Sequence, residues 1–126
     1  MKLSAATFVA RDVDALAGFY GAALGLAETV DDSPRYRELE GGGVRVGFAF
    51  TGAYELLGLQ DDAEVSGLRS FLTFEVPEAD MAEAVAQAVG QGAALVKAPY
   101  RTHFGALLAV LRDPEGNAFR LVGGAA

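Results

Sequence analysis

A run of residues close to the C-terminus combines a tight turn with a charged side chain between two apolar neighbours. Pro114 has a fixed φ and Gly116 readily takes a positive φ, so we expect the chain to reverse here between antiparallel strands. In the second strand Phe119 and Leu121 share one face, because side chains alternate along a strand. Arg120 then lies on the other face, where its guanidinium can bind an anion or pair with an acidic neighbour.

Further side chains able to do chemistry lie around His103, which is the one histidine of the chain. Its imidazole can hydrogen-bond a ligand or act as a general acid or base, with Tyr100 or Glu75 as an assisting group. An exposed loop histidine without a role is the alternative. Phe104 and Tyr100 can cover the apolar part of a ligand. Arg45 is a second candidate cation, because it lies opposite the large apolar residues of its strand.

Composition narrows the classes of function. The 126 residues suit one domain with a sizeable core. Without Cys and with one His, the chain cannot form disulfides, thiolate metal sites or multi-histidine sites. A formal net charge of -7 disfavours nucleic acid and anionic membranes as partners. No signal-peptide pattern and no apolar run of about 18 residues is present, so we expect a soluble cytoplasmic protein.

The first half of the chain reads as a strand, a helix and three strands. Apolar residues at spacings of three, four and seven predict a helix over 13–24, capped by Asp12 or Asp14 and ended by Gly25. The strands are expected at 3–10, 27–31, 36–40 and 44–50, with a hairpin at Gly41-Gly42-Gly43 between the last two.

The same order of elements returns in the second half. The expected elements are a strand at 70–76, a helix at 78–89 after Pro77, and strands at 94–97, 106–111 and 118–122. Residues 52–67 lack a clear period and read as a connection, with a short helical turn at 54–57. We therefore predict a single domain, 1–126, built from two copies of a βαβββ module at 1–51 and 68–124.

Two motifs frame this duplicated unit. The first is the run 12–20 followed by Leu24-Gly25-Leu26, and the second is 113–117, Asp-Pro-Glu-Gly-Asn, followed by an apolar strand. With both motifs at this separation, the chain resembles the vicinal oxygen chelate superfamily of glyoxalases, bleomycin-resistance proteins and extradiol dioxygenases. The resemblance implies an α+β fold: two paired modules form a curved, incompletely closed mixed sheet, with helices outside and a ligand cavity on the concave side.

Metal-dependent members of that superfamily hold a divalent ion with His and Glu on the inward faces of four strands. Carried over to this chain, these four positions fall at Ala5, Gly47 (within one residue), Phe71 and Arg120. None of these side chains binds a divalent cation, and the guanidinium is always charged. We therefore expect no metal and no cofactor. A displaced metal site made of Glu38, Glu75 and His103 is the alternative.

Two classes of function follow from the resemblance. The first is a metal-independent small-molecule-binding protein of the glyoxalase and bleomycin-resistance type, which sequesters a drug or metabolite in the concave cavity. The absent metal ligands favour it. The second is a lyase, isomerase or dioxygenase-like enzyme with a displaced metal or with metal-free chemistry by His103, Tyr100 or Glu75. A regulatory or structural module without a dedicated ligand is a third possibility.

The binding protein would hold its ligand with residues of both modules. Arg120, Phe71 and Arg45 are expected to enter the cavity together, with Tyr100, His103 and Phe104 around it. A buried guanidinium needs a partner, so either Glu75 or an anionic group of the ligand is expected to satisfy Arg120.

The resemblance also implies a homodimer. The exposed sheet edges and a helix face with Ala79, Ala82 and Ala86 permit close approach of a second chain. The modules can pair within one chain or between two.

Overall fold

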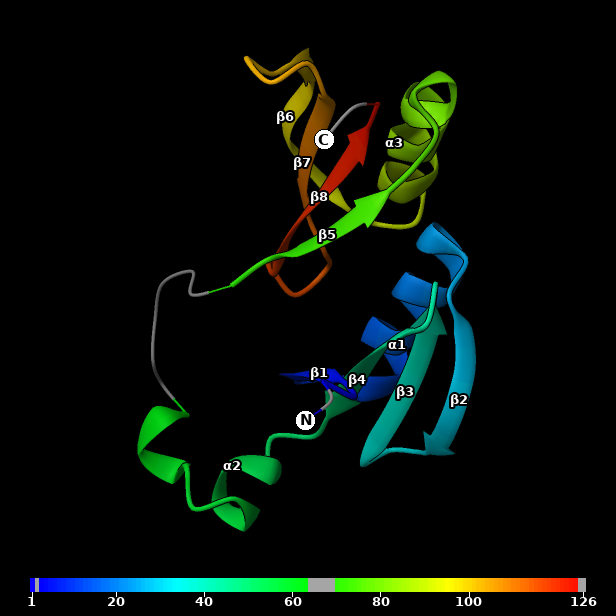
Figure 1. The fold of residues 1–126 in the computed structure, drawn as a ribbon. Helices are drawn as coiled ribbons and strands as arrows, with labels where there is room; N and C mark the ends of the chain where they lie inside the picture. Colours follow the sequence, from blue (N-terminus) through cyan, green and yellow to red (C-terminus); the bar gives the residue numbers. More distant parts are fainter. Residues whose placement is uncertain (2, 64–69, 125–126) are drawn as a thin grey trace. The chain divides into compact units, whose positions relative to one another are not determined.

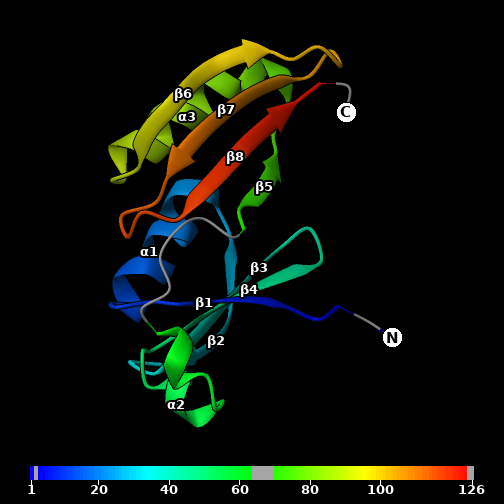
Figure 2. The same cartoon turned by 90° about the vertical axis from the view of Figure 1, so that its left-hand side faces the viewer.

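The computed structural model describes residues 1, 3–63 and 70–124, and Figures 1 and 2 show its ribbon from two directions. The chain divides into two compact units, Met1–Gly67 and Leu68–Ala126. Each unit contains an open four-stranded mixed sheet and a helix packed against it, in the predicted order. The α+β class expected from the sequence is therefore confirmed. The predicted connection, 52–67, lies partly outside the described residues.

The first unit starts with the predicted strand, helix and three strands. Its elements are β1 (Ala6–Val9), α1 (Val13–Leu24), β2 (Ala27–Asp32), β3 (Tyr36–Gly41), β4 (Val44–Ala49), α2 (Ala53–Leu56) and a 3₁₀ turn (Gln60–Asp62). The strand order is β1-β4-β3-β2, with β1 parallel to β4 and the other pairs antiparallel. The cap of α1 is Asp12, whose Oδ1 accepts the Ala15 N–H at 3.0 Å, and Gly25 ends the helix at φ 69°.

The helix α1 covers one face of this sheet. Tyr20 of α1 and Phe48 of β4 are both fully buried, with ring centroids 5.3 Å apart. Val46 is buried with them, so the alternation predicted for β4 holds and places Arg45 and Gly47 on the opposite side. We call this opposite side the helix-free face of the unit.

The second unit repeats this arrangement. Its elements are β5 (Leu72–Glu75), a 3₁₀ turn (Glu78–Asp80), α3 (Met81–Gly90), β6 (Ala94–Arg101), β7 (Leu107–Arg112) and β8 (Ala118–Gly123). The strand order is β5-β8-β7-β6, with β5 parallel to β8. Phe119 and Leu121 are fully buried on the side of α3. Arg120 lies on the helix-free face of this unit, as its neighbours predict.

The strand β6 is longer than the sequence predicted. The expected strand ended at Lys97, whereas β6 continues to Arg101, so Tyr100 lies in a strand and not in a loop. Pro99 lies inside β6, although proline lacks a backbone N–H and cannot donate a hydrogen bond to a neighbouring strand. It is accommodated because β6 is an edge strand whose register shifts between Lys97 and Tyr100.

The turn between β7 and β8 is organised by a buried carboxylate. Asp113 is 3% exposed, and its Oδ1 accepts the backbone N–H groups of Glu115 and Asn117 at 2.9 and 3.0 Å. Gly116 has φ 89°, as predicted. Asn117 is of a residue type that tolerates the left-handed region, but its φ is not positive, since every positive φ in the described residues belongs to a glycine. Its amide Nδ2 donates to Asp113 at 2.9 Å.

A membrane-spanning helix is not found in the described ranges, because none of their helices combines the necessary length and apolar character.

Candidate functional site

The helix-free faces of the two units carry corresponding residues in register. In the first unit Thr7 pairs with Gly47, and Gly47 pairs with Glu38. In the second unit Thr73 pairs with Arg120, and Arg120 pairs with Val110. The duplicated scaffold therefore presents a glycine beside a carboxylate in one copy, and an arginine beside a valine in the other.

Arg120 is held by two neighbours on β5 and the segment just before it. Its Nε donates a hydrogen bond to Thr73 Oγ1 at 2.8 Å, and its guanidinium carbon lies 5.3 Å from the centroid of the Phe71 ring. The ring is 52% exposed. The structure thus brings Arg120 and Phe71 together on one face, with the hydrogen bond and the cation–π contact fixing the plane of the guanidinium.

Glu75, which the sequence predicts as one of two alternative partners of Arg120, forms no ion pair with it. The ion pairs among the described residues involve Arg37 and Arg101 as cations, and none joins Arg120 to Glu75. Glu75 instead lines a pocket of about 350 Å³, together with Val76, Pro77, Val122 and Gly124. In the described part of the chain the two terminal nitrogens of Arg120 have no hydrogen-bond acceptor.

A second cation lies on the same face of this sheet. Lys97 of β6 pairs with Val110 of β7, and Val110 pairs with Arg120 of β8, so the three side chains lie on the same face of the sheet. The ammonium nitrogen of Lys97 lies 3.9 Å above the centroid of the Tyr100 ring. The sequence does not predict a role for Lys97, because the expected strand ends at this residue and the register shifts that orient its side chain leave no periodic signal.

The structure pairs His103 with an aromatic neighbour, and the acid–base role expected for it stays a prediction. The rings of His103 and Phe104 meet edge to face, with centroids 5.1 Å apart. Within the ranges that the structure describes, no hydrogen bond joins His103 to Tyr100 or Glu75. Phe104 is 48% exposed on this loop.

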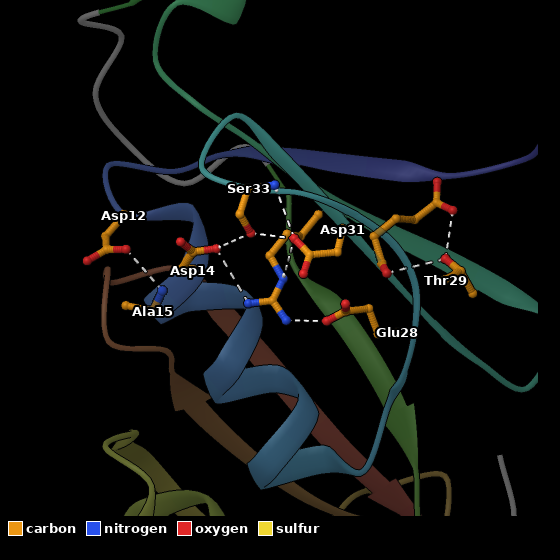
Figure 3. Close-up of polar contacts among 9 residues, drawn as sticks. Asp12, Asp14, Ala15, Glu28, Thr29, Asp31 and Ser33 are labelled. Carbon is orange, nitrogen blue, oxygen red and sulfur yellow. Dashed lines mark hydrogen bonds and ion pairs between the residues drawn. The ribbon is translucent and has the colours of Figure 1, made fainter.

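The first unit holds a polar cluster that the sequence did not predict. Glu38 is only 9% exposed, and its two carboxylate oxygens accept hydrogen bonds from Thr29 Oγ1 at 2.8 Å and Tyr36 Oη at 3.1 Å (Figure 3 shows Thr29). Burial raises the pKa of Tyr36, and the hydrogen bond to Glu38 is the second cause of this increase. A Cβ at Gly47 would lie 2.5 Å from Tyr36 Oη and 2.8 Å from Thr7 Oγ1.

Arg45 belongs to the first unit, on the strand beside this cluster, and its side chain is exposed. Its positive charge slightly opposes the increase in the pKa of Tyr36. The expectation that Arg45 and Arg120 share one cavity concerns two different units and stays a prediction.

A separate charged cluster lies on the helix side of the first sheet (Figure 3). Arg37 is hydrogen-bonded to Glu28 and approaches Asp14 of α1 at 3.5 Å and Asp31 at 4.0 Å. Ser33 Oγ donates to Asp14 at 2.7 Å. These contacts tie α1 to the hairpin of β2 and β3, so we assign the cluster a structural role.

A family model described as a glyoxalase-like domain matches residues 5–122. The chain belongs to this family. The superfamily resemblance seen in the two motifs is thereby confirmed.

Solved structures support this assignment. A glyoxalase/bleomycin resistance protein/dioxygenase family enzyme from Burkholderia phytofirmans PsJN is 37% identical, with 98% of each chain covered and a TM-score of 0.94. The fosfomycin resistance protein FosX from Mesorhizobium loti is 15% identical, with 98% and 92% covered and a TM-score of 0.74. Lactoylglutathione lyase from Agrobacterium tumefaciens is 16% identical, with 98% and 93% covered and a TM-score of 0.73. The last two show the shared fold alone. No curated protein matches the chain.

The residues of this glyoxalase-like chain do not fit the divalent metal that its superfamily implies. Gly47 offers no donor atom, and Tyr36 Oη occupies the space into which a side chain there would extend. Arg120 places a positive charge at another of the implied ligand positions. Among residues 1, 3–63 and 70–124, no three His, Cys, Asp or Glu side chains are grouped so that they could hold a metal ion.

Proposed function

We propose that this glyoxalase-like protein binds a small molecule without the help of a metal ion, and that Arg120 holds an anionic group of that molecule. The observation that carries the proposal is the set of contacts around the guanidinium. Nε is satisfied by Thr73 and one face by Phe71, while the terminal nitrogens have no acceptor in the described residues.

The free edge of Arg120 suits a carboxylate or a phenolate. A guanidinium presents parallel N–H groups that match the two oxygens of a carboxylate, and such charge-assisted bonds are about twice as strong as neutral ones. Thr73 reduces the loss of side-chain freedom on binding, because it already orients the group. Phe71 offers exposed apolar surface for the remainder of the ligand.

An enzyme is the second candidate. The description of the Burkholderia protein as a family enzyme favours it, since that protein is 37% identical to this chain. The acid–base group expected for such an enzyme is His103 with Tyr100 or Glu75, and no hydrogen bond joins these residues in the described part of the chain. We therefore place sequestration of an anionic small molecule first.

Thermal-shift measurements with matched compound pairs test this proposal. Benzoate, phenylacetate and salicylate are each compared with their neutral amides, because a compound that binds only the native state raises the unfolding midpoint. The acids should raise the midpoint of the wild type more than the amides do. Arg120→Met should abolish this difference, whereas Arg35→Met, which removes an arginine stacked on Phe50 in the other unit, should retain it.

Equal shifts for acids and amides would contradict the proposal. So would an acid-specific shift that survives Arg120→Met.

The expected homodimer also stays a prediction at this stage. The exposed edge strands β2 and β6 are compatible with it.

A further inference from the structure

A comparison of the two repeated units shows which residues of the first unit are not needed to form its sheet. The sheet registers match three polar residues of the first unit with three apolar residues of the second: Thr29 with Val96, Tyr36 with Leu108, and Glu38 with Val110. Since the second unit forms the same sheet with valine and leucine at these positions, the polar group in the first unit is not needed to build the fold.

Glu38 forms no ion pair with any residue that the structure describes. It is 9% exposed, and none of the ion pairs within 4.0 Å in the described ranges includes it. Thr29 and Tyr36 fill two acceptor positions of its carboxylate, which has about four. Burying a carboxylate without a cationic partner is costly, so the remaining acceptor positions are suited to a positively charged donor.

Two backbone features build this arrangement. The register of β2 shifts between Glu28 and Val30, and the extra residue, Thr29, directs its hydroxyl to Glu38. On β4, Gly47 leaves the space that Tyr36 Oη occupies, because a Cβ there would meet this oxygen at 2.5 Å. The carboxylate is thus held by side chains from β2 and β3 above a strand that has no side chain at this point.

We propose that Glu38, oriented by Tyr36 and Thr29, binds a protonated amine or a comparable cationic group of a small molecule on the helix-free face of the first unit. The overall charge of -7 favours the approach of such a cation. This proposal goes beyond anion binding by Arg120, since it concerns the other charge, the other unit and a separate set of residues.

Benzylamine, which is protonated at neutral pH, is the probe, and benzyl alcohol is its neutral counterpart. Amide NMR spectra of the full chain are followed during titration of each compound. The wild type should show saturable shifts with benzylamine on β3 and β4 and much weaker ones with benzyl alcohol. Glu38→Gln should weaken benzylamine binding at least about tenfold, because a hydrogen bond to a charged group is lost. The matched control Glu83→Gln, which removes an exposed carboxylate of α3, should change it less than about twofold.

Two further variants separate binding from folding. Thr29→Val introduces the residue type of the second unit, so it should fold normally and bind benzylamine more weakly than the wild type. Arg120→Met should bind benzylamine at least as tightly as the wild type, which distinguishes this site from the anion site. Glu38→Gln should have an unchanged or higher unfolding midpoint without any ligand, because it removes a buried carboxylate that forms no ion pair with a described residue.

Three results would overturn the proposal. These are a lack of saturable benzylamine shifts in the wild type, equal benzylamine affinity of wild type and Glu38→Gln, and a clear drop in the ligand-free unfolding midpoint of Glu38→Gln. The last result would show that the carboxylate is a structural charge.

Discussion

Arg120 Nε donates a hydrogen bond to Thr73 Oγ1 at 2.8 Å across the parallel pair β5 and β8. At the matching place in the first unit, Thr7 pairs with Gly47 across β1 and β4. Arg120 of the second unit thus corresponds to Gly47 of the first. Gly47 has no side chain, and the hydroxyl of Tyr36 occupies the space where one would begin. The two matching positions therefore carry different polar groups, which are the guanidinium of Arg120 in the second unit and the hydroxyl of Tyr36 beside Glu38 in the first.

The ion pair of Glu78 and Arg101 should make stability depend on pH in the acid range. The hydrogen bond from Arg101 lowers the pKa of Glu78 below its usual value. A carboxylate with a lower pKa in the folded state stabilises the fold above its unfolded pKa, and this contribution is lost as pH falls through the folded pKa. Urea unfolding of wild type and Glu78→Gln between neutral and acid pH measures it. The variant should lose less stability on acidification, and equal losses would contradict the prediction.

The phenol of Tyr36 should lose its proton at a higher pH than an ordinary tyrosine does. Burial and the hydrogen bond to Glu38 raise its pKa in the folded state. Its contribution to stability is therefore present below the unfolded pKa of about 10 and is lost as pH rises through the folded value. Near-ultraviolet absorbance can follow the four tyrosines of the chain during alkaline titration. Tyr36→Phe should remove the absorbance change that occurs at the highest pH. If this change is the same in the variant, it does not come from Tyr36.

Asp113→Ala should destabilise the turn between β7 and β8. The carboxylate is 3% exposed and accepts the N–H groups of Glu115 and Asn117, which would lose their partner. We expect a loss of about 1–3 kcal/mol in the free energy of unfolding, measured with urea. Asp80→Ala is the control, since this exposed aspartate makes no side-chain cap on α3, and its effect should stay within about 0.5 kcal/mol. Similar losses in both variants would show that the turn does not depend on this network.

Local patterns in the sequence predicted most of the fold. The spacing of apolar residues gave the helix α1, Gly25 its end, and the Pro–Gly turn the hairpin of β7 and β8. The alternation in β8 also predicted correctly that Arg120 lies on the face opposite Phe119. These features depend on residues that are close in the chain, so their signal is visible without a structure.

The polar cluster of the first unit was not predictable in the same way. The sequence predicts Glu38 only as a ligand of a displaced metal, and it indicates no role for Tyr36 or Thr29. Their contact depends on the register of β2 with β3 and on a bulge at Thr29, neither of which leaves a local pattern. The length of β6 was missed for a related reason, because Pro99 is tolerated in an edge strand.

Purified protein should contain no stoichiometric divalent metal. The positions implied by the superfamily hold Gly47 and Arg120 among others, and neither can bind such an ion. Elemental analysis of protein purified without chelators checks this expectation. Glyoxalase activity should also be absent after addition of nickel or zinc. One tightly bound ion per chain would contradict metal-independent binding and favour the enzyme.

Binding of benzoate to wild type and to Arg120→Met, measured by titration calorimetry, tests the central claim most directly. Arg120→Met keeps a similar volume and removes the charge, so we expect a folded variant that loses about 1.5–3 kcal/mol of binding free energy, or about tenfold or more in affinity. Arg35→Met should bind benzoate as the wild type does, and benzamide should bind both proteins equally weakly. If Arg120→Met binds benzoate as tightly as the wild type, Arg120 is not the anion site of this protein.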